Sequence, residues 1–136
     1  MLNKMFRHSD LVKKGLDATW LKMEVAAQNI SNADTPGYDA RRVEFEEHLA
    51  GALNPGSALQ IKATRDKHIR IGEPDPLKVT PKIVSDRHYV ARMDDNNVDI
   101  DKEMVDMAKN TIQYNALIQK INKEFARLKY AIRGGA

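Results

Sequence analysis

The chain contains no cysteine and few aromatic residues, and both shortages limit what it can be. Without cysteine there can be no disulfide, no thiolate nucleophile and no cysteine-ligated zinc site. A single tryptophan and an aromatic content of 6% leave few large side chains for a core, although 136 residues are enough for one domain. The apolar residues lie mainly towards the two ends of the chain, so we expect the ends to carry the fold.

Long apolar runs and a strong charge of one sign are also missing. No stretch approaches the roughly 18 apolar residues of a membrane-spanning helix, and the first ten residues lack the apolar core of a cleaved signal peptide. The 22 Lys and Arg residues nearly balance the 19 Asp and Glu residues, which leaves a formal net charge of +3. This mild excess does not indicate a protein that binds nucleic acid.

Residues that carry catalysis or hold a cofactor form no recognisable motif. The sequence has no nucleophile–base arrangement, no glycine-rich phosphate loop and no close pair of histidines. Asp95, Asn97, Asp99 and Asp101 alternate like the first ligands of a calcium loop, but Ile100 stands where such a loop needs glycine. We therefore expect a protein without enzymatic activity, cofactor, metal site, small-molecule substrate or nucleic-acid partner.

The C-terminal third has the strongest periodic pattern. Two companion series with heptad spacing run through it: Ile100, Met107, Tyr114, Ile121 and Leu128, and Met104, Thr111, Ile118, Phe125 and Ile132. This spacing predicts an amphipathic helix over about 98–133, with both series in its seam. Asp99 is a candidate N-cap, and Gly134-Gly135 a stop signal. Beside the seam lies a second apolar strip of Val98, Val105, Ala108 and Ile112, which indicates burial against other chains.

A weaker pattern at the other end predicts a helix over about 2–32. Its two series are Leu2, Ser9, Leu16, Met23 and Ile30, and Met5, Val12, Thr19 and Ala26. Gly15 weakens this helix by about 1 kcal/mol relative to alanine. The helix should end in the Asn- and Asp-rich segment before Pro36-Gly37, a pair that fits the centre of a type II turn. This turn is either a local helix terminator or a joint at which side-chain amides bond to a neighbouring subunit.

The middle of the chain is less regular. Val43–Leu53 has the spacing of a short helix, and residues 54–97 hold four of the five prolines. Candidate strands at 59–61, 68–71 and 82–84 are too short to form a stable sheet alone. The predicted fold class is therefore mainly α. Residues 1–33 and 98–133 pair antiparallel as a coiled-coil-like bundle that forms one discontinuous domain, while 34–97 form a turn, a short helix and an extended, weakly β or flexible segment.

Two segments of the chain resemble a known family. Residues 27–38 read AQNISNADTPGY, which resembles the signature of the bacterial flagellar axial proteins, the subunits of rod, hook and hook-associated structures. Residues 97–132 are similar to the closing helix of the same family, and the short length and the ending from 121 to 132 are closest to the rod subunits. The sequence favours one of two sister proximal rod proteins. The resemblance implies a structural protein of bacterial motility that self-assembles into the periplasmic rod of the basal body.

The same resemblance implies partners and an interface. Such subunits leave the cell by flagellar type III export without a cleaved signal peptide, and their neighbours are other rod proteins, the adaptor at the rod base and further copies. The expected subunit-interface residues are Leu16, Met23, Asn29, Ile30, Asn32, Pro36, Gly37, Tyr38, Met104, Met107, Ile112, Tyr114, Ile118, Ile121, Phe125 and Leu128. The periodicity by itself also fits a soluble coiled-coil adaptor or an export chaperone.

Overall fold

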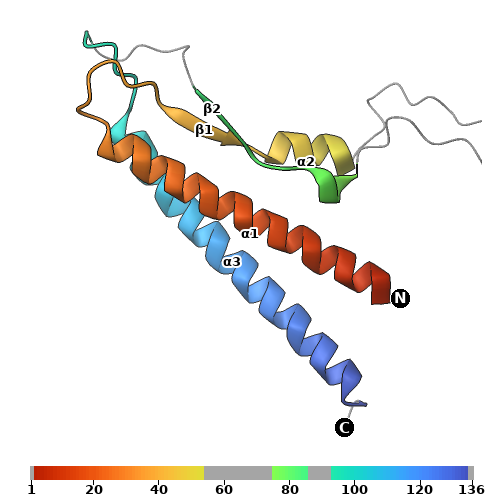
Figure 1. Ribbon diagram of the computed structural model, residues 1–136. Helices are drawn as coiled ribbons and strands as arrows, with labels where there is room; N and C mark the ends of the chain where they lie inside the picture. Colours follow the sequence, from red (N-terminus) through yellow and green to blue (C-terminus); the bar gives the residue numbers. More distant parts are fainter. Residues whose placement is uncertain (1, 54–74, 86–92, 135–136) are drawn as a thin grey trace, which may run out of the picture.

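Two long helices dominate the computed structural model, which describes residues 2–53, 75–85 and 93–134 (Figure 1). In chain order the elements are helix α1 (Leu2–Ser31), strand β1 (Arg41–Glu44), helix α2 (Glu46–Leu53), the short 3-10 helix η2 (Pro76–Lys78), strand β2 (Lys82–Ser85) and helix α3 (Ile100–Ile132). The strands, α2 and η2 lie along one side of α1, and α1 begins at the same end of the helix pair at which α3 finishes (Figure 1). The predicted mainly α fold is confirmed.

Helices α1 and α3 pack antiparallel in a single register. Their contacts join, in order along α1, Ser9 to Glu124, Gly15 to Leu117, Met23 to Thr111 and Asn29 to Glu103. Because the partners move back along α3 as the contacts move forward along α1, the predicted antiparallel pairing is confirmed. The helix ends also agree with the sequence: the Asp99 carboxylate accepts a hydrogen bond from the Lys102 N–H at 3.2 Å, as expected of an N-cap.

The seam of α3 differs from the prediction mainly in one of its two series. Met107, Tyr114, Ile121 and Leu128 are half-buried, as predicted for a helix seam. The companion series is only partly in the seam: Thr111 contacts Met23 of α1 and Ile118 is half-buried. Met104 and Phe125 are more than half exposed and Ile132 is 80% exposed, so the prediction is wrong for these three, as it is for Ile100 of the first series, which is 41% exposed. The positions that alternate with the first series in the half-buried face are Glu103, Asn110, Leu117 and Glu124. Three of these four are polar, so a search for apolar periodicity selects the neighbouring row instead.

The middle segment forms a small antiparallel sheet against α1. Glu44 lies opposite Lys82 and Arg41 opposite Ser85, so the strand predicted at 82–84 is confirmed as part of β2. The helix predicted from Val43 begins only at Glu46, because Val43 is held in the sheet opposite Ile83. The candidate strands at 59–61 and 68–71 lie outside the described residues.

Small residues on α1 let other elements approach it from two sides. Ala18, Thr19 and Val25 are at most 3% exposed, and α1 contacts α3 as well as β1 and η2. Polar contacts fix the sheet side: Lys14 Nζ donates to the Val79 carbonyl oxygen at 2.9 Å, and Lys22 Nζ binds a carboxylate oxygen of Glu46. Helix α1 is therefore the central element of the fold.

Within the described ranges, no helix has the combination of length and hydropathy that crossing a membrane requires.

Candidate functional site

Asn29 is the centre of the elbow, a name we use for residues 29–41 and 94–99, where α1 ends and α3 begins. Its side chain has no exposed surface. The amide nitrogen donates to the Arg41 carbonyl oxygen at 2.7 Å and to a Glu103 carboxylate oxygen at 3.0 Å. The amide oxygen accepts from the Arg41 N–H at 3.0 Å and from the Tyr38 hydroxyl at 3.3 Å. One buried side chain therefore holds the end of α1, the start of β1 and the first turn of α3 together.

Asn96 joins the two segments of the elbow from the segment that precedes α3. It is also fully buried, and its amide nitrogen lies 2.9, 3.0 and 2.8 Å from the carbonyl oxygens of Asn32, Ala33 and Thr35. These carbonyl groups belong to the turn that follows α1, and backbone carbonyl groups removed from water need hydrogen-bond partners, which Asn96 supplies. Gly37 has a φ of 69°, and its N–H donates to the Asp94 carbonyl oxygen at 2.9 Å. The Asn-rich turn is thus a helix terminator whose bonds are made within the chain.

Glu103, in the first turn of α3, is hydrogen-bonded to Asn29 of the elbow and has a perturbed pKa. Burial raises the pKa of its carboxyl above the ordinary value, and the nearby carboxylates of Asp106 and Asp99 add to the rise. The hydrogen bond from Asn29 and the positive charge of Lys102 act in the opposite direction. Among the described residues, no group of three or more histidine and acidic side chains could hold a metal ion.

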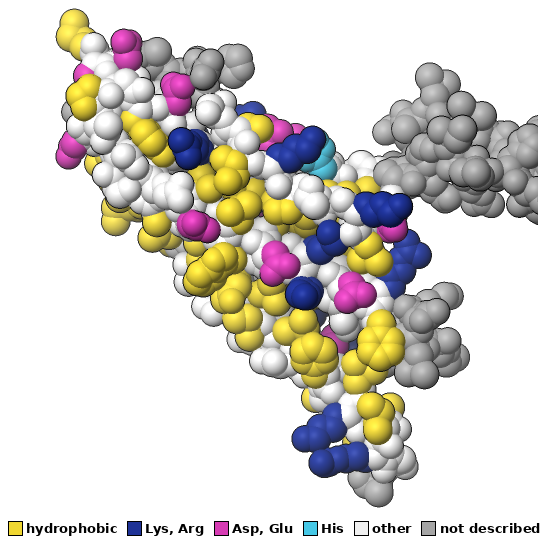
Figure 2. Space-filling view, in the orientation of Figure 1, with side chains coloured by type: hydrophobic (Ala, Val, Ile, Leu, Met, Phe, Trp, Pro, Cys, Tyr) yellow, Lys and Arg dark blue, Asp and Glu magenta, His cyan; other side chains and the backbone are white. Residues whose placement is uncertain are grey.

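One flank of the helix pair exposes large apolar side chains. We call this the apolar flank; it consists of Phe6, Trp20, Met104, Val105, Ile112 and Phe125, which are between 53% and 72% exposed. Trp20 packs its ring against Tyr114, with the ring centroids 6.0 Å apart. Figure 2 shows hydrophobic side chains gathered along the length of the helix pair, with charged side chains between them. So many exposed aromatic and branched residues on one flank indicate a surface for another protein.

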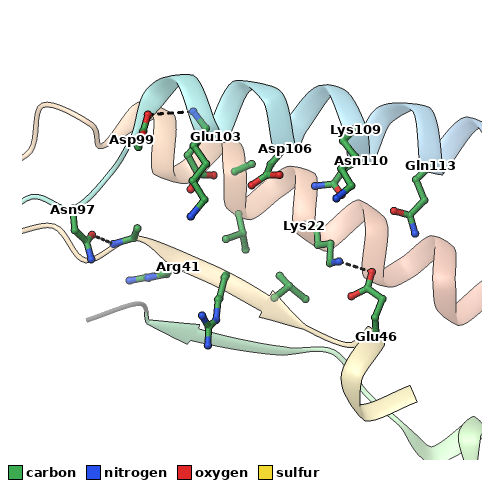
Figure 3. A pocket seen from close by; sticks show the side chains of 16 residues that line it. Lys22, Arg41, Glu46, Asn97, Asp99, Glu103, Asp106, Lys109, Asn110 and Gln113 are labelled. Atoms are coloured by element: carbon green, nitrogen blue, oxygen red, sulfur yellow. Dashed lines mark hydrogen bonds and ion pairs between the residues drawn. The ribbon is translucent and has the colours of Figure 1, made fainter. Parts of the chain in front are cut away.

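The opposite flank of α3 is polar and faces the sheet across a groove of about 750 Å³. Side chains of Glu103, Asp106, Lys109 and Gln113 line it from α3, and β1 forms the facing wall (Figure 3). Val25 and Ala26 of α1 also line it. The two flanks of α3 therefore differ in chemistry, one apolar and uncovered, the other charged and bordering a groove.

The structure places the sixteen predicted interface residues in three settings. Within the helix pair, half-buried, lie Leu16, Met23, Ile30, Met107, Tyr114, Ile118, Ile121 and Leu128. On the apolar flank lie Met104, Ile112 and Phe125. In the elbow lie Asn29, Asn32, Pro36, Gly37 and Tyr38, of which Pro36 and Gly37 are exposed. Contact with a neighbouring subunit stays a prediction for all of them.

Sequence reasoning missed residues that organise the elbow and the flank. Asn96 and Asn97 were not selected, although Asn97 accepts the Ala40 N–H at 2.6 Å and Asn96 is buried. Two adjacent asparagines just before the segment that enters a helix, here one residue ahead of the N-cap, are a usable signal, because asparagine readily bonds to backbone groups in turns. Glu103 was not selected either, because no sequence pattern indicates that it would contact Asn29.

Comparisons with known proteins agree on one family. A family model described as "Flagella basal body rod protein" matches residues 14–38, the second half of α1 and the turn that follows it. The chain is 33% identical to the flagellar basal body rod protein FlgB of Bacillus subtilis over 124 residues, which cover 91% of this chain and 92% of that protein. It is 35% identical to FlgB of Borrelia hermsii over 109 residues, with 78% and 81% covered. The chain is 27% identical to FlgB of Escherichia coli over 142 residues, which cover 99% of each protein.

Proposed function

The chain belongs to the family of flagellar basal body rod proteins FlgB, and we infer that it is a structural subunit of the flagellar basal-body rod. Similarity extends over most of the chain and of its relatives, so the inference concerns the whole protein and not one segment. The alternative functions, a coiled-coil adaptor or an export chaperone, are not favoured, because the relatives are named as rod proteins.

The observation that carries an assembly role is the apolar flank. A fully buried Ile or Phe side chain contributes roughly 1.5–3 kcal/mol relative to an exposed one. Ile112 is 72% exposed, Met104 58% and Phe125 53%, so most of this stabilisation is not realised within the single chain. Contact between the apolar flank and neighbouring subunits would realise it. We therefore assign the subunit interface first to Met104, Ile112 and Phe125, and assign the half-buried seam residues a supporting role.

Further properties belong to the same proposal. We propose that residues 1–33 and 98–133 act as one discontinuous unit, because the polar contacts of the elbow and the antiparallel seam join them. The partners are further copies, other rod proteins, the adaptor at the rod base and the type III export apparatus. The protein reaches the periplasmic rod without a cleaved signal peptide and acts through contacts alone, without catalysis.

A pair of charge substitutions tests the interface. Ile112→Asp places a carboxylate in the middle of the apolar flank, and it should leave the isolated chain folded but abolish rod assembly and motility. Lys120→Asp is the control, since Lys120 is an exposed polar residue on the same helix. Circular dichroism checks the fold, while swimming in soft agar and electron microscopy of basal bodies check assembly. Normal motility with Ile112→Asp would exclude the apolar flank as an interface, and intact basal bodies in a deletion strain would exclude the rod function.

A further inference from the structure

Asn110 is a buried polar side chain without a hydrogen-bond partner. It is 9% exposed and lies in the half-buried face of α3, where a helix pair usually carries apolar residues. No described residue bonds to its side-chain amide. Every fully enclosed side-chain nitrogen and oxygen of the described residues has a partner, so the unpaired amide can be reached from the groove that Asn110 lines. Because an unpaired buried amide destabilises a fold, this amide has a role outside the single chain.

The groove itself takes a side chain and not a strand. On the β1 side it is closed at one end by the bonds of Asn29 to the Arg41 backbone, and at the other by the contact of Lys22 with Glu46. These contacts leave no room for an extended chain beside β1. The wall that α3 forms is lined by side chains that carry free polar groups (Figure 3). A single polar side chain that enters beside α3 therefore fits the groove.

Oxygen acceptors line the α3 wall on both sides of Asn110. Glu103, Asp106, Asn110 and Gln113 follow one another along α3 at spacings of three and four residues, which place them on one side of the helix (Figure 3). Burial raises the pKa of Glu103, and the Asp106 carboxylate adds to the rise, so the two negative charges lie close together. Two close carboxylates beside an amide oxygen suit a cation with several N–H donors, which is the chemistry of a guanidinium group.

Two lysines compete for the same carboxylates. Lys102 and Lys109 also line the groove, and Lys102 lowers the pKa of Glu103. Both lysines are exposed, and neither forms an ion pair with a described residue. Because an ammonium group is strongly hydrated, both can turn out to water when a guanidinium enters. The lysines therefore leave the site accessible.

Arg127 is the arginine that can fill such a site in a neighbouring copy. The described arginines of α1 and β1 already have contacts within the chain, namely Arg7–Asp75, Arg42–Glu44 and Arg41–Tyr38. Arg127 and Arg133 are exposed and have no partner among the described residues. Arg133 follows the end of α3, whereas Arg127 lies within the helix, about five turns after Lys109 and so on the same flank.

We propose that the groove binds the Arg127 side chain of a second copy of the chain. The guanidinium donates to the carboxylates of Glu103 and Asp106 and to the amide oxygen of Asn110. Within one copy Arg127 lies about 30 Å further along α3 than Asp106, so it cannot reach its own groove. The acidic part of the α3 flank in one copy thus pairs with the basic part in another. The inference rests on the proposed rod function, which places copies of the chain next to one another.

Cross-linking between two single-cysteine variants tests the proposal, because the natural chain has no cysteine. Full-length Lys109→Cys protein carries a thiol in the groove, and affinity-tagged full-length Lys123→Cys protein carries one about a helical turn before Arg127. The two are mixed with a short thiol-specific cross-linker, and a mixed dimer is expected. Adding Arg127→Ala to the tagged chain should lower its yield at least about tenfold, because charge-assisted hydrogen bonds are lost. Arg133→Ala is the matched control and should leave the yield within about twofold.

Asn110→Leu separates binding from folding. Leucine suits the half-buried face of α3 and removes an unpaired amide, so the variant should be at least as stable as the parent chain in urea unfolding. The same substitution in the Lys109→Cys chain should lower the cross-linked yield at least about fivefold, because the guanidinium loses an acceptor. A loss of stability would contradict the proposal, because it would show that the amide has a partner within the chain.

Three cross-linking results would overturn the proposal. They are the absence of a mixed dimer, an unchanged yield with Arg127→Ala, which would leave only water in the groove, and equal losses with Arg127→Ala and Arg133→Ala. Each of them leaves the rod function untouched, because assembly is scored separately by basal-body microscopy.

Discussion

The buried amide of Asn29 allows the sharpest prediction of stability. Asn29→Ala leaves the N–H and C=O of Arg41, a carboxylate oxygen of Glu103 and the hydroxyl of Tyr38 without this partner. A buried polar group that loses its hydrogen bond costs about 1–3 kcal/mol. The side chains of Glu103 and Tyr38 are partly exposed and can bond to water, so the two backbone groups of Arg41 decide the effect. We expect a loss of about 2–4 kcal/mol in the free energy of unfolding.

Urea unfolding followed by circular dichroism measures this loss, with the slope of the transition checked for constancy. Asn32→Ala is the matched control. The Asn32 amide bonds only to nearby groups of its own helix end, such as the Gln28 carbonyl oxygen at 2.8 Å, and the residue is partly exposed. Water can replace those bonds, so the control should lose less than about 1 kcal/mol. Equal losses for the two variants would refute the role of Asn29 as the central tie of the elbow.

Two further predictions concern the pKa of Glu103 and the backbone at Gly37. Because the folded-state pKa of Glu103 is raised, the folded chain holds this proton more tightly than the unfolded chain. The resulting stabilisation of the folded chain is fully present when the pH is below the ordinary carboxyl pKa of 4.5. It is lost as the pH rises through the raised pKa of Glu103. The Glu103→Gln variant should therefore be at least as stable as the parent chain at pH 7, and its free energy of unfolding should change less between neutral and acidic pH. A pH dependence equal to that of the parent would contradict this. Gly37→Ala places a side chain at a φ of 69° and should cost about 1–2 kcal/mol in urea unfolding; a neutral result would show that the turn relaxes.

Periodicity was sufficient for the main elements of the fold. The heptad spacing of α3, its cap at Asp99 and the end of α1 before Pro36-Gly37 all depend on local rules, and the structure follows them. The seam could not be read in the same way, because Glu103 and Asn110 face α1 while the apolar Met104 does not. Apolar residues mark every surface that becomes buried, including surfaces that other chains cover, so the sequence alone does not separate an internal seam from an external one.

The candidate site was less accessible to sequence reasoning than the fold. The Asn-rich turn was recognised, but its bonding partners are Arg41, Glu103 and the segment around Asn96, which lie up to 74 residues away. No local rule reports a contact over such a separation. The start of α2 was misplaced for a related reason: Val43 has the spacing of a helix, but the distant Ile83 draws it into a sheet. Tertiary contacts overrode local preference at both places.

Gly15 provides a test of how closely α1 and α3 are fitted. Glycine in the middle of a helix costs about 1 kcal/mol relative to alanine, and a Cβ added at Gly15 would meet Leu117 Cδ1 at 3.5 Å, an ordinary van der Waals distance. Gly15→Ala should therefore raise the free energy of unfolding by roughly 1 kcal/mol in urea titrations. Gly15→Leu, which keeps the helix propensity but adds volume that the approach of Leu117 does not leave free, should instead lower it by about 1–3 kcal/mol. If both substitutions stabilise the chain to the same extent, the helices are not in close contact at this level, and the register that places Gly15 against Leu117 is wrong.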